Sequence, residues 1–188
     1  MQDVLILASA SPRRSELLKL MGIQFEVIPS EVDENVNGAP DEIVLCLSER
    51  KARAVAEKHP GRVVLASDTV VFCDGTVFGK PRDEADAFRM LNMLQNNRNE
   101  VWTGVCVIDR SGNAFKAAEK TDVYFDVMSE TDIRHYIACG EPMDKAGAYG
   151  AQGMGGMYVK SINGSMSNVI GLPMHIVKHL LEKIEFNF

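Results

Sequence analysis

The chain has little of what marks secreted, membrane or zinc-binding proteins. Its 188 residues include four cysteines, none in a C-x-x-C pair, which argues against a disulfide framework or a zinc site. We expect these cysteines, Cys46, Cys73, Cys106 and Cys139, to be reduced core residues. No run of about 18 apolar residues occurs, so no membrane-spanning helix is expected.

Positive charge is also scarce. Lys and Arg number 20 against 26 Asp and Glu, a formal net charge of -6 at pH 7. Binding to nucleic acid or to an anionic membrane surface needs a large basic face, so neither partner is expected and any phosphate site must be local. The N-terminus lacks the basic and apolar regions of a signal peptide, and we expect a cytoplasmic protein.

The chain has no long linker, repeat or low-complexity segment. We therefore expect one domain, residues 1–188, of a length that also permits a division into two lobes. Helical and β-prone patterns alternate, which predicts an α/β fold with a mixed sheet. The predicted helices cover 12–21, 41–58, 83 onward, 130–139 and the segment after 173, and the predicted strands cover 4–7, 25–28, 63–66, 70–73, 76–78, 101–108, 115–127 and 157–159.

Two adjacent arginines lie where a β-prone run gives way to a helix. Ser11 is a good N-cap, and Pro12 suits the first helical position. Arg13 and Arg14 therefore fall in the first turn, where their positive charge opposes the helix dipole unless a phosphate binds there. The alternative is that both arginines are solvated or pair with acids such as Glu16.

A lysine interrupts the apolar face of the second predicted helix. A step of about 100° per residue puts Lys51 among apolar residues, namely Ile43, Val44, Leu47, Ala54 and Val55. A half-buried lysine must extend to solvent or find a partner. Lys51 therefore either pairs with a core acid or points into a cleft where it meets a phosphate.

Asp68 and Thr69 follow an apolar run, and we expect them at a strand end. Ligands of α/β proteins gather beyond the carboxyl ends of strands, where an aspartate can hold a cation or accept a proton from water. An Asp-Thr pair is also a common turn former. Lys80 lies between Gly79 and Pro81 and either faces solvent or reaches a phosphate.

Three acids and a glycine-rich stretch complete the candidate set. Magnesium takes one or two protein carboxylates, and among Glu31, Asp33 and Glu34 we favour Glu31; an exposed acidic loop is the alternative. The stretch 147–156 does not match G-x-x-x-x-G-K-[ST] or a dinucleotide fingerprint, so we expect a flexible wall or a plain surface loop. In a wall, Gln152 can read a base edge, because an amide both donates and accepts hydrogen bonds.

Other catalytic groups are not indicated. His175 and His179 form the one i, i+4 histidine pair, and with no acid or cysteine expected nearby to complete a ligand set we expect a surface or packing role. No G-x-S-x-G elbow for a serine nucleophile occurs.

In this order, the motifs resemble those of the Maf family of nucleoside triphosphate pyrophosphatases, nearly end to end. The segments that carry the resemblance are 7–9, 11–14, 30–34, 51–52, 67–69, 79–81, 141–153 and 168–173. The chain departs from the family pattern at 99–101, where a histidine often precedes the valine, and at Met166, where a tyrosine is frequent.

The resemblance implies a fold and an activity. The fold is a mixed twisted sheet flanked by helices, with two lobes and a central cleft, related to the inosine triphosphate pyrophosphatases; members commonly form homodimers. The Asp-Thr pair and the Ala-Gly-Ala-Tyr-Gly loop with its Gln are those of the subfamily that hydrolyses dTTP and UTP, not of the 7-methyl-GTP branch. The product would be the monophosphate and pyrophosphate, which removes non-standard or excess nucleotides. The alternatives are a pyrophosphatase for damaged purine nucleotides and a nucleotide-binding regulator of septum formation.

The resemblance also implies roles for residues. Asp68 would be the proton acceptor, and Arg13, Thr69 and Gln152 would shape nucleotide choice. A divalent cation, Mg²⁺ or Mn²⁺, would lie near Asp68 and Glu31. The expected substrate-binding residues are Ser9, Arg13, Arg14, Lys51, Thr69, Lys80 and Gln152.

Overall fold

The computed structural model describes residues 3–187. Two compact units are formed from segments that alternate along the chain. Unit 1 comprises the chain up to Asp68, Thr103–Glu119, and the chain from Gly171 onward; unit 2 comprises Thr69–Trp102 and Lys120–Ile170.

The strands belong to one mixed sheet with the order β2-β1-β3-β5-β6-β7, and β4 pairs with β3. β1 is parallel to β2 and β3, whereas β4 and β7 are antiparallel to their partners. This confirms the predicted α/β class with a mixed sheet. The strands are β1 (Val4–Leu7), β2 (Gln24–Val27), β3 (Val64–Cys73), β4 (Thr76–Phe78), β5 (Arg98–Ile108), β6 (Ala114–Phe125) and β7 (Val159–Asn163).

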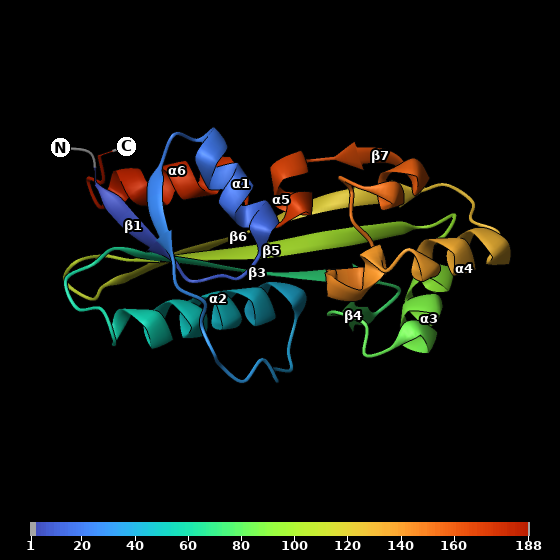
Figure 1. Cartoon of the computed structure of the whole chain (residues 1–188), viewed down its shortest axis with the longest axis horizontal. Helices are drawn as coiled ribbons and strands as arrows, with labels where there is room; N and C mark the ends of the chain where they lie inside the picture. Colours follow the sequence, from blue (N-terminus) through green and yellow to red (C-terminus); the bar gives the residue numbers. More distant parts are fainter. Residues whose placement is uncertain (1–2, 188) are drawn as a thin grey trace. The chain divides into compact units, whose positions relative to one another are not determined.

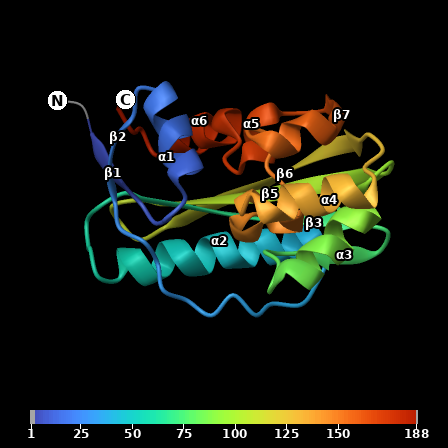
Figure 2. The same ribbon diagram turned by 45° about the vertical axis from the view of Figure 1, so that its right-hand side comes forward.

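Helices flank the strands in both units. In unit 1, α2 covers one face of the strands while α1 and α6 lie on the other (Figures 1 and 2). All five predicted helices are confirmed, and the short α5 was not predicted. The helices are α1 (Pro12–Leu20), α2 (Pro40–Ala56), α3 (Glu84–Leu94), α4 (Glu130–Ala138), α5 (Met166–Ile170) and α6 (Met174–Lys183), with 3₁₀ turns η1 (Glu141–Asp144), η2 (Ala146–Ala148) and η3 (Met154–Tyr158).

Unit 1 has its own apolar core between the strands and α2. Ile6 and Val64 are paired across β1 and β3, and both pack with Val55 of α2. Gly104 allows α2 to lie close to β5, because a Cβ at this position would overlap the carbonyl of Val44. The packing fixes the rotation of α2 and, with it, the direction of Lys51.

Unit 2 has a second core, in which Phe78, Leu91 and Tyr136 are almost fully buried. Local sequence signals set its elements. The predicted hairpin turn is confirmed: Asp74 and Gly75 have φ of 46° and 78°, the left-handed conformations of a tight turn between antiparallel strands.

The helices of unit 2 begin as the capping residues predict. The side chains of Asp83 and Ser129 accept hydrogen bonds from the N–H groups of Asp86 and Asp132, and α3 and α4 start one residue later. Gly140 follows α4 with a φ of 79°, so the predicted end of this helix is also confirmed.

The expectation that Asp68 and Thr69 lie at a strand end was wrong. β3 runs without a break from Val64 to Cys73 and passes through both residues. Its second half is held by β4, where Val71 pairs with Phe78. The strand that ends is the neighbouring β1, whose last residue, Leu7, lies opposite Leu65. Asp68 is therefore three positions beyond the end of the shared β1–β3 ladder.

Two smaller expectations need correction. The strand predicted over 157–159 begins at Val159 and runs to Asn163, because Met157 lies in the turn η3 and the pairing with β6 starts at Val159.

All four cysteines have free thiols, but Cys139 is exposed, so the expected core position holds for Cys73 and Cys106. Burial raises the pKa of the Cys106 thiol to about 12.

Among residues 3–187, none of the helices combines the length and the apolar content that a membrane crossing needs.

Candidate functional site

Ser9 lies between β1 and α1 and is 7% exposed. Its Oγ accepts hydrogen bonds from the N–H of Ser11 (3.2 Å) and from Nη1 of Arg14 (3.1 Å). Ser11 occupies the predicted N-cap position, although its side chain makes no capping hydrogen bond in the described structure. Arg13 and Arg14 lie in the first turn of α1, as predicted, and Arg13 is half-buried.

The guanidinium group of Arg14 is fixed by backbone and hydroxyl oxygens. Its Nε donates to the carbonyl of Gly171 over 2.9 Å, and the hydroxyl of Ser67 donates to the same carbonyl over 3.0 Å. Burial lowers the pKa of Arg14, and the negative charge of Asp68 works against that shift. Gly171 is 157 residues away in the sequence, so periodicity alone cannot find this contact.

Lys51 pairs with two carboxylates. Its Nζ lies 2.6 Å from Oδ1 of Asp68 and 2.8 Å from Oε1 of Glu34. Lys51 and Asp68 are 8% and 7% exposed, so their charges are largely removed from water and stabilise each other. The alternative in which Lys51 pairs with a buried acid is therefore confirmed. The charges of Asp68 and Glu34 also act on the guanidinium of Arg14, so two carboxylates lie near two cations at this point.

The acidic segment contributes Glu34 to this group. Glu31 is exposed, and its role as a metal ligand stays a prediction. The segment is tied to α2 through Arg50, whose Nη1 donates to the carbonyl of Asp33 over 2.5 Å. Asp33 also accepts a hydrogen bond from the N–H of Asn35 over 2.9 Å, which forms a local turn beside Glu34. The sequence shows three acids close together but not which of them reaches Lys51.

The remaining candidates belong to unit 2. Thr69 is half-buried in β3, while Lys80 and Gln152 are exposed. The carbonyl of Gly79 accepts a hydrogen bond from the N–H of Gly147 over 3.0 Å. The structure thus joins the backbone next to Lys80 to the start of the glycine-rich stretch.

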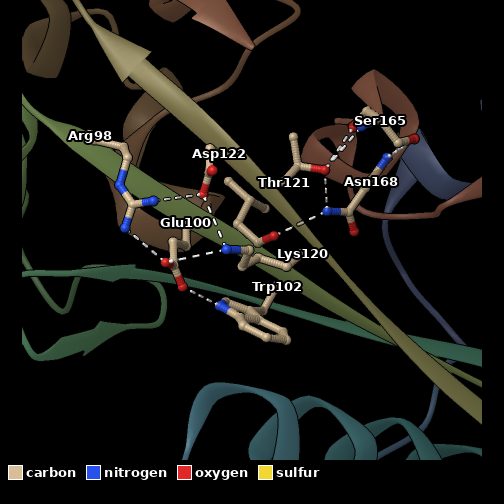
Figure 3. Close-up of polar contacts among 9 residues, drawn as sticks. Arg98, Glu100, Trp102, Lys120, Thr121, Asp122, Ser165 and Asn168 are labelled. Carbon is tan, nitrogen blue, oxygen red and sulfur yellow. Dashed lines mark hydrogen bonds and ion pairs between the residues drawn. The ribbon is translucent and has the colours of Figure 1, made fainter. Parts of the chain in front are cut away.

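A charged cluster on β5 and β6 also lies in unit 2 (Figure 3). Arg98 contacts Glu100 over 3.0 Å and Asp122 over 3.3 Å, and Lys120 lies 3.6 Å from both acids. The indole N–H of Trp102 donates to Glu100 over 3.0 Å. Alternating charges across two paired strands stabilise their register, so we assign this cluster a structural role. Glu100 belongs to the segment 99–101 that departs from the family pattern.

The asparagine of the segment 168–173 has a structural role as well. Nδ2 of Asn168 donates to the carbonyl of Val101 (3.0 Å) and to Oγ1 of Thr121 (2.9 Å), and the N–H of Ser165 donates to the same Oγ1 (3.1 Å) (Figure 3). These bonds attach α5 to β5 and β6. Met166, the other departure, is 43% exposed at the start of this helix.

The histidine pair lies in unit 1 at the start of α6. The rings of His175 and His179 are 6.3 Å apart, and Glu119 of β6 lies 3.7 Å from His175. The expectation that no acid is nearby was therefore wrong, because β6 brings Glu119 from far away in the sequence. No group of three or more His, Cys, Asp or Glu side chains suited to a metal occurs within residues 3–187.

Comparisons with known proteins cover almost the whole chain. Residues 4–184 match the family described as Maf-like protein. The chain is 47% identical over 184 residues to a dTTP/UTP pyrophosphatase of Symbiobacterium thermophilum, which covers 97% of this chain and 94% of that protein. It is 49% identical over 173 residues to a dTTP/UTP pyrophosphatase of Citrifermentans bemidjiense, with 90% of each chain covered.

Among solved structures, the chain aligns with that of the Staphylococcus aureus Ham1 protein. The alignment covers 97% of this chain and 98% of that protein, at 15% identity and a TM-score of 0.49.

Proposed function

This chain belongs to the family of Maf-like proteins, and we propose that it hydrolyses dTTP and UTP to the nucleoside monophosphate and pyrophosphate. The curated relatives that carry the name dTTP/UTP pyrophosphatase support this substrate class. The observation that carries the proposal is the contact of buried Lys51 with buried Asp68 and exposed Glu34 in unit 1, which combines a cation suited to phosphate with carboxylates suited to a divalent metal.

The positively charged side chains of unit 1 are assigned to binding the polyphosphate of the substrate. Arg14 is held in one orientation by Ser9 and by the carbonyl of Gly171, so little freedom is lost when a phosphate binds. Lys51 can exchange a carboxylate for a phosphate oxygen without leaving its place on α2. Arg13, in the same turn as Arg14, and Lys80 of unit 2 are proposed as further phosphate ligands. Fixed positive charges of this kind stabilise the charge that develops during phosphoryl transfer.

A divalent cation fits the donor set. Magnesium typically takes one or two protein carboxylates and leaves its other positions to phosphate oxygens and water. Asp68 and Glu34 both reach the same Nζ and therefore lie next to each other. We propose Mg²⁺ or Mn²⁺, with Asp68 as one ligand and either Glu34 or Glu31 as the other. When bound, the cation would polarise the phosphate oxygens.

Asp68 is also assigned as the proton acceptor. Lys51 contacts Oδ1 and thereby orients the carboxylate, and we assign Oδ2 as the atom that receives a proton from the attacking water. The water oxygen then forms a bond to the α-phosphorus. The P–O bond between the α-phosphorus and the oxygen that bridges to the β-phosphorus breaks, and pyrophosphate leaves with the electron pair of that bond.

Base choice is assigned first to Gln152 of unit 2. Gln152 is exposed, and its amide can donate to one carbonyl of uracil or thymine while accepting from the imide N–H. Thr69 and Arg13 are proposed to contribute to the same choice.

A substrate panel tests this function. The purified protein is incubated with magnesium and UTP, dTTP, GTP or ITP in turn, and pyrophosphate release is measured. We expect the highest kcat/KM for UTP and dTTP. A preference for ITP would favour the pyrophosphatase of damaged purine nucleotides, and binding of UTP without turnover would favour the nucleotide-binding regulator.

A homodimer and a cytoplasmic location stay predictions. Sedimentation analysis of the purified chain and fluorescence microscopy of a tagged chain in its own cell would check them.

A further inference from the structure

We propose that Glu141 and Tyr136 are positioning residues that hold the Gln152 segment, residues 149–156, and thereby set base selectivity. The inference rests on the proposed function, in which Gln152 reads the base. Tyr136 lies in α4, Glu141 opens η1, and both belong to unit 2 together with the segment that they contact.

The pair binds the segment before and after Gln152. The hydroxyl of Tyr136 accepts a hydrogen bond from the N–H of Gly150 over 3.1 Å. Glu141 accepts from the N–H of Met154 over 2.9 Å and from the N–H of Gly155 over 3.2 Å. Tyr136 in turn donates to Glu141 over 2.7 Å. The two side chains, Tyr136 and Glu141, thus form one hydrogen-bonded group, which we call the tether. Gln152 therefore lies on a short turn between two fixed backbone positions.

The charge state of the pair suits this role. Burial raises the pKa of Glu141, but the hydrogen bonds from Tyr136, Met154 and Gly155 outweigh that effect and leave the pKa below its ordinary value. Burial and the contact with Glu141 raise the pKa of Tyr136, so its hydroxyl keeps the proton that it donates. Hydrogen bonds to an ionised carboxylate are stronger than those between neutral groups.

Three glycines bring the backbone onto this tether. A Cβ at Gly155 would overlap the hydroxyl of Tyr136, and a Cβ at Gly153 would overlap the carboxylate of Glu141. At Gly150 it would lie 2.5 Å from Cε of Lys145, whose Nζ donates to the carbonyl of Glu141 over 2.7 Å. The glycines here permit close approach, not mobility. The proposed tether argues against the expected flexible wall, and amide exchange at Gly150 and Met154 tests the difference.

The start of the segment has a separate anchor in the core. Tyr149 is 5% exposed, its ring packs edge-on against Phe125 with centroids 4.7 Å apart, and its hydroxyl donates to Oδ1 of Asn99 over 3.0 Å. This anchor lies before Gly150, whereas after Gln152 the backbone N–H groups of Met154 and Gly155 are held by Glu141, and the Met154 side chain packs against the core. Loss of the carboxylate should therefore free residues 152–155 while Tyr149 stays in place.

Two conservative variants test the tether. Glu141→Gln keeps the size of the side chain but replaces one acceptor oxygen with a donor, and Tyr136→Phe removes the hydroxyl. We expect the ratio of kcat/KM for UTP to kcat/KM for ITP to fall about 10-fold in each variant, toward the ratio found for Gln152→Ala. The reason is that a displacement of a positioning group by about 1 Å can lower the rate by up to about 10²-fold. Amide exchange at Gly150 and Met154 should become faster.

Matched controls separate positioning from folding. Glu130→Gln alters a surface carboxylate of α4 that pairs with Arg134 over 2.7 Å, and it should change neither the ratio nor the exchange. Gly153→Ala, which presses a methyl group onto Glu141, should lower the ratio as Glu141→Gln does. A lower melting temperature with an unchanged UTP/ITP ratio in both Glu141→Gln and Gly153→Ala would overturn the proposal.

The double variant Glu141→Gln with Gln152→Ala gives the sharpest result. If Glu141 acts through Gln152, the double variant has the same UTP/ITP ratio as Gln152→Ala. A further drop would show that Glu141 acts independently and would overturn the proposal. A wild-type enzyme without base preference would refute the role of Gln152 itself, and unchanged exchange in Glu141→Gln would refute the tether.

Discussion

The two units fix their candidate residues by different physical means. In unit 1, Lys51 is held by the opposite charges of Asp68 and Glu34, and a phosphate or a metal ion can compete for the same charges. In unit 2, Gln152 carries no charge, and the backbone around it is held by hydrogen bonds to Glu141 and Tyr136. Charges that exchange partners suit the binding of a polyphosphate, whereas a fixed backbone suits the recognition of a neutral base.

This difference predicts two classes of variant. Changes in the charged group of unit 1 should lower hydrolysis of every triphosphate by a similar factor. Changes in the Gln152 segment or its tether should alter the ratio between bases while most of the turnover on the preferred substrate remains.

The largest effect is expected from removal of the divalent cation. Excess chelator should abolish hydrolysis of UTP, dTTP and ITP alike, and added magnesium or manganese should restore it, because the metal neutralises the phosphates that all triphosphates share. Pyrophosphate release is the measurement. Hydrolysis that continues at full rate in excess chelator would leave Lys and Arg side chains as the electrophiles.

Asp68→Asn should come next. The amide cannot accept the proton and is a poorer metal ligand, so kcat should fall by at least about 10²-fold on every triphosphate. Circular dichroism would establish that the variant is folded. A matched control is Asp86→Asn, which alters a buried carboxylate of unit 2 that pairs with Arg82 and Arg89 and should leave kcat unchanged. Near-normal turnover by folded Asp68→Asn would remove Asp68 from the mechanism.

Lys51→Met tests whether the lysine is both structural and catalytic. Its removal leaves two carboxylates without their shared cation, so the free energy of unfolding should fall by roughly 3 kcal/mol, and turnover should fall for all bases. The double variant Lys51→Met with Asp68→Asn should regain much of that stability but none of the activity. Denaturant unfolding beside kinetics gives both quantities. A less stable Lys51→Met with wild-type turnover would show a structural role alone.

Gln152→Glu should have a smaller and base-dependent effect. An ionised glutamate can only accept hydrogen bonds, and a buried polar group left unpaired costs about 1 to 3 kcal/mol. The kcat/KM for UTP should therefore fall by about 10-fold or more, and that for ITP by less. Equal losses on both substrates would mean that base selectivity lies elsewhere.

Local sequence signals predicted much of the fold. Caps, glycines and the hairpin turn set the ends of the helices and of β4, because these signals act within a few residues. The apolar face of α2 also identified Lys51 as an unusual lysine. Its two possible partners could not be separated, because Asp68 is 17 residues away and is brought to Lys51 by the packing of α2 on the strands.

Other features depend on contacts that no local pattern contains. Asp68 was expected at a strand end because it follows an apolar run, but pairing with β4 extends β3 past it. Glu34 rather than Glu31 reaches Lys51 because the loop that carries it is tied to α2 by Arg50. The glycines around Gln152 were interpreted as flexible because their close contacts with Glu141 and Tyr136 appear only in three dimensions.

The smallest predicted effect concerns pH. The folded-state pKa of Glu141 lies below its ordinary value of 4.5, so its carboxylate contributes stability that is fully present above that pH. The contribution is lost as the pH falls through the folded pKa. The difference in melting temperature between the wild-type protein and Glu141→Gln should therefore shrink below pH 4.5. A difference that stays constant down to pH 3 would contradict the assigned hydrogen bonds.

The most direct test of the central claim is the identity of the products. Phosphorus NMR of UTP incubated with the protein and magnesium should show UMP and pyrophosphate appearing in equal amounts, and Asp68→Asn should nearly abolish both signals. Formation of UDP and inorganic phosphate, or equal rates for Asp68→Asn and the wild-type protein, would contradict the account.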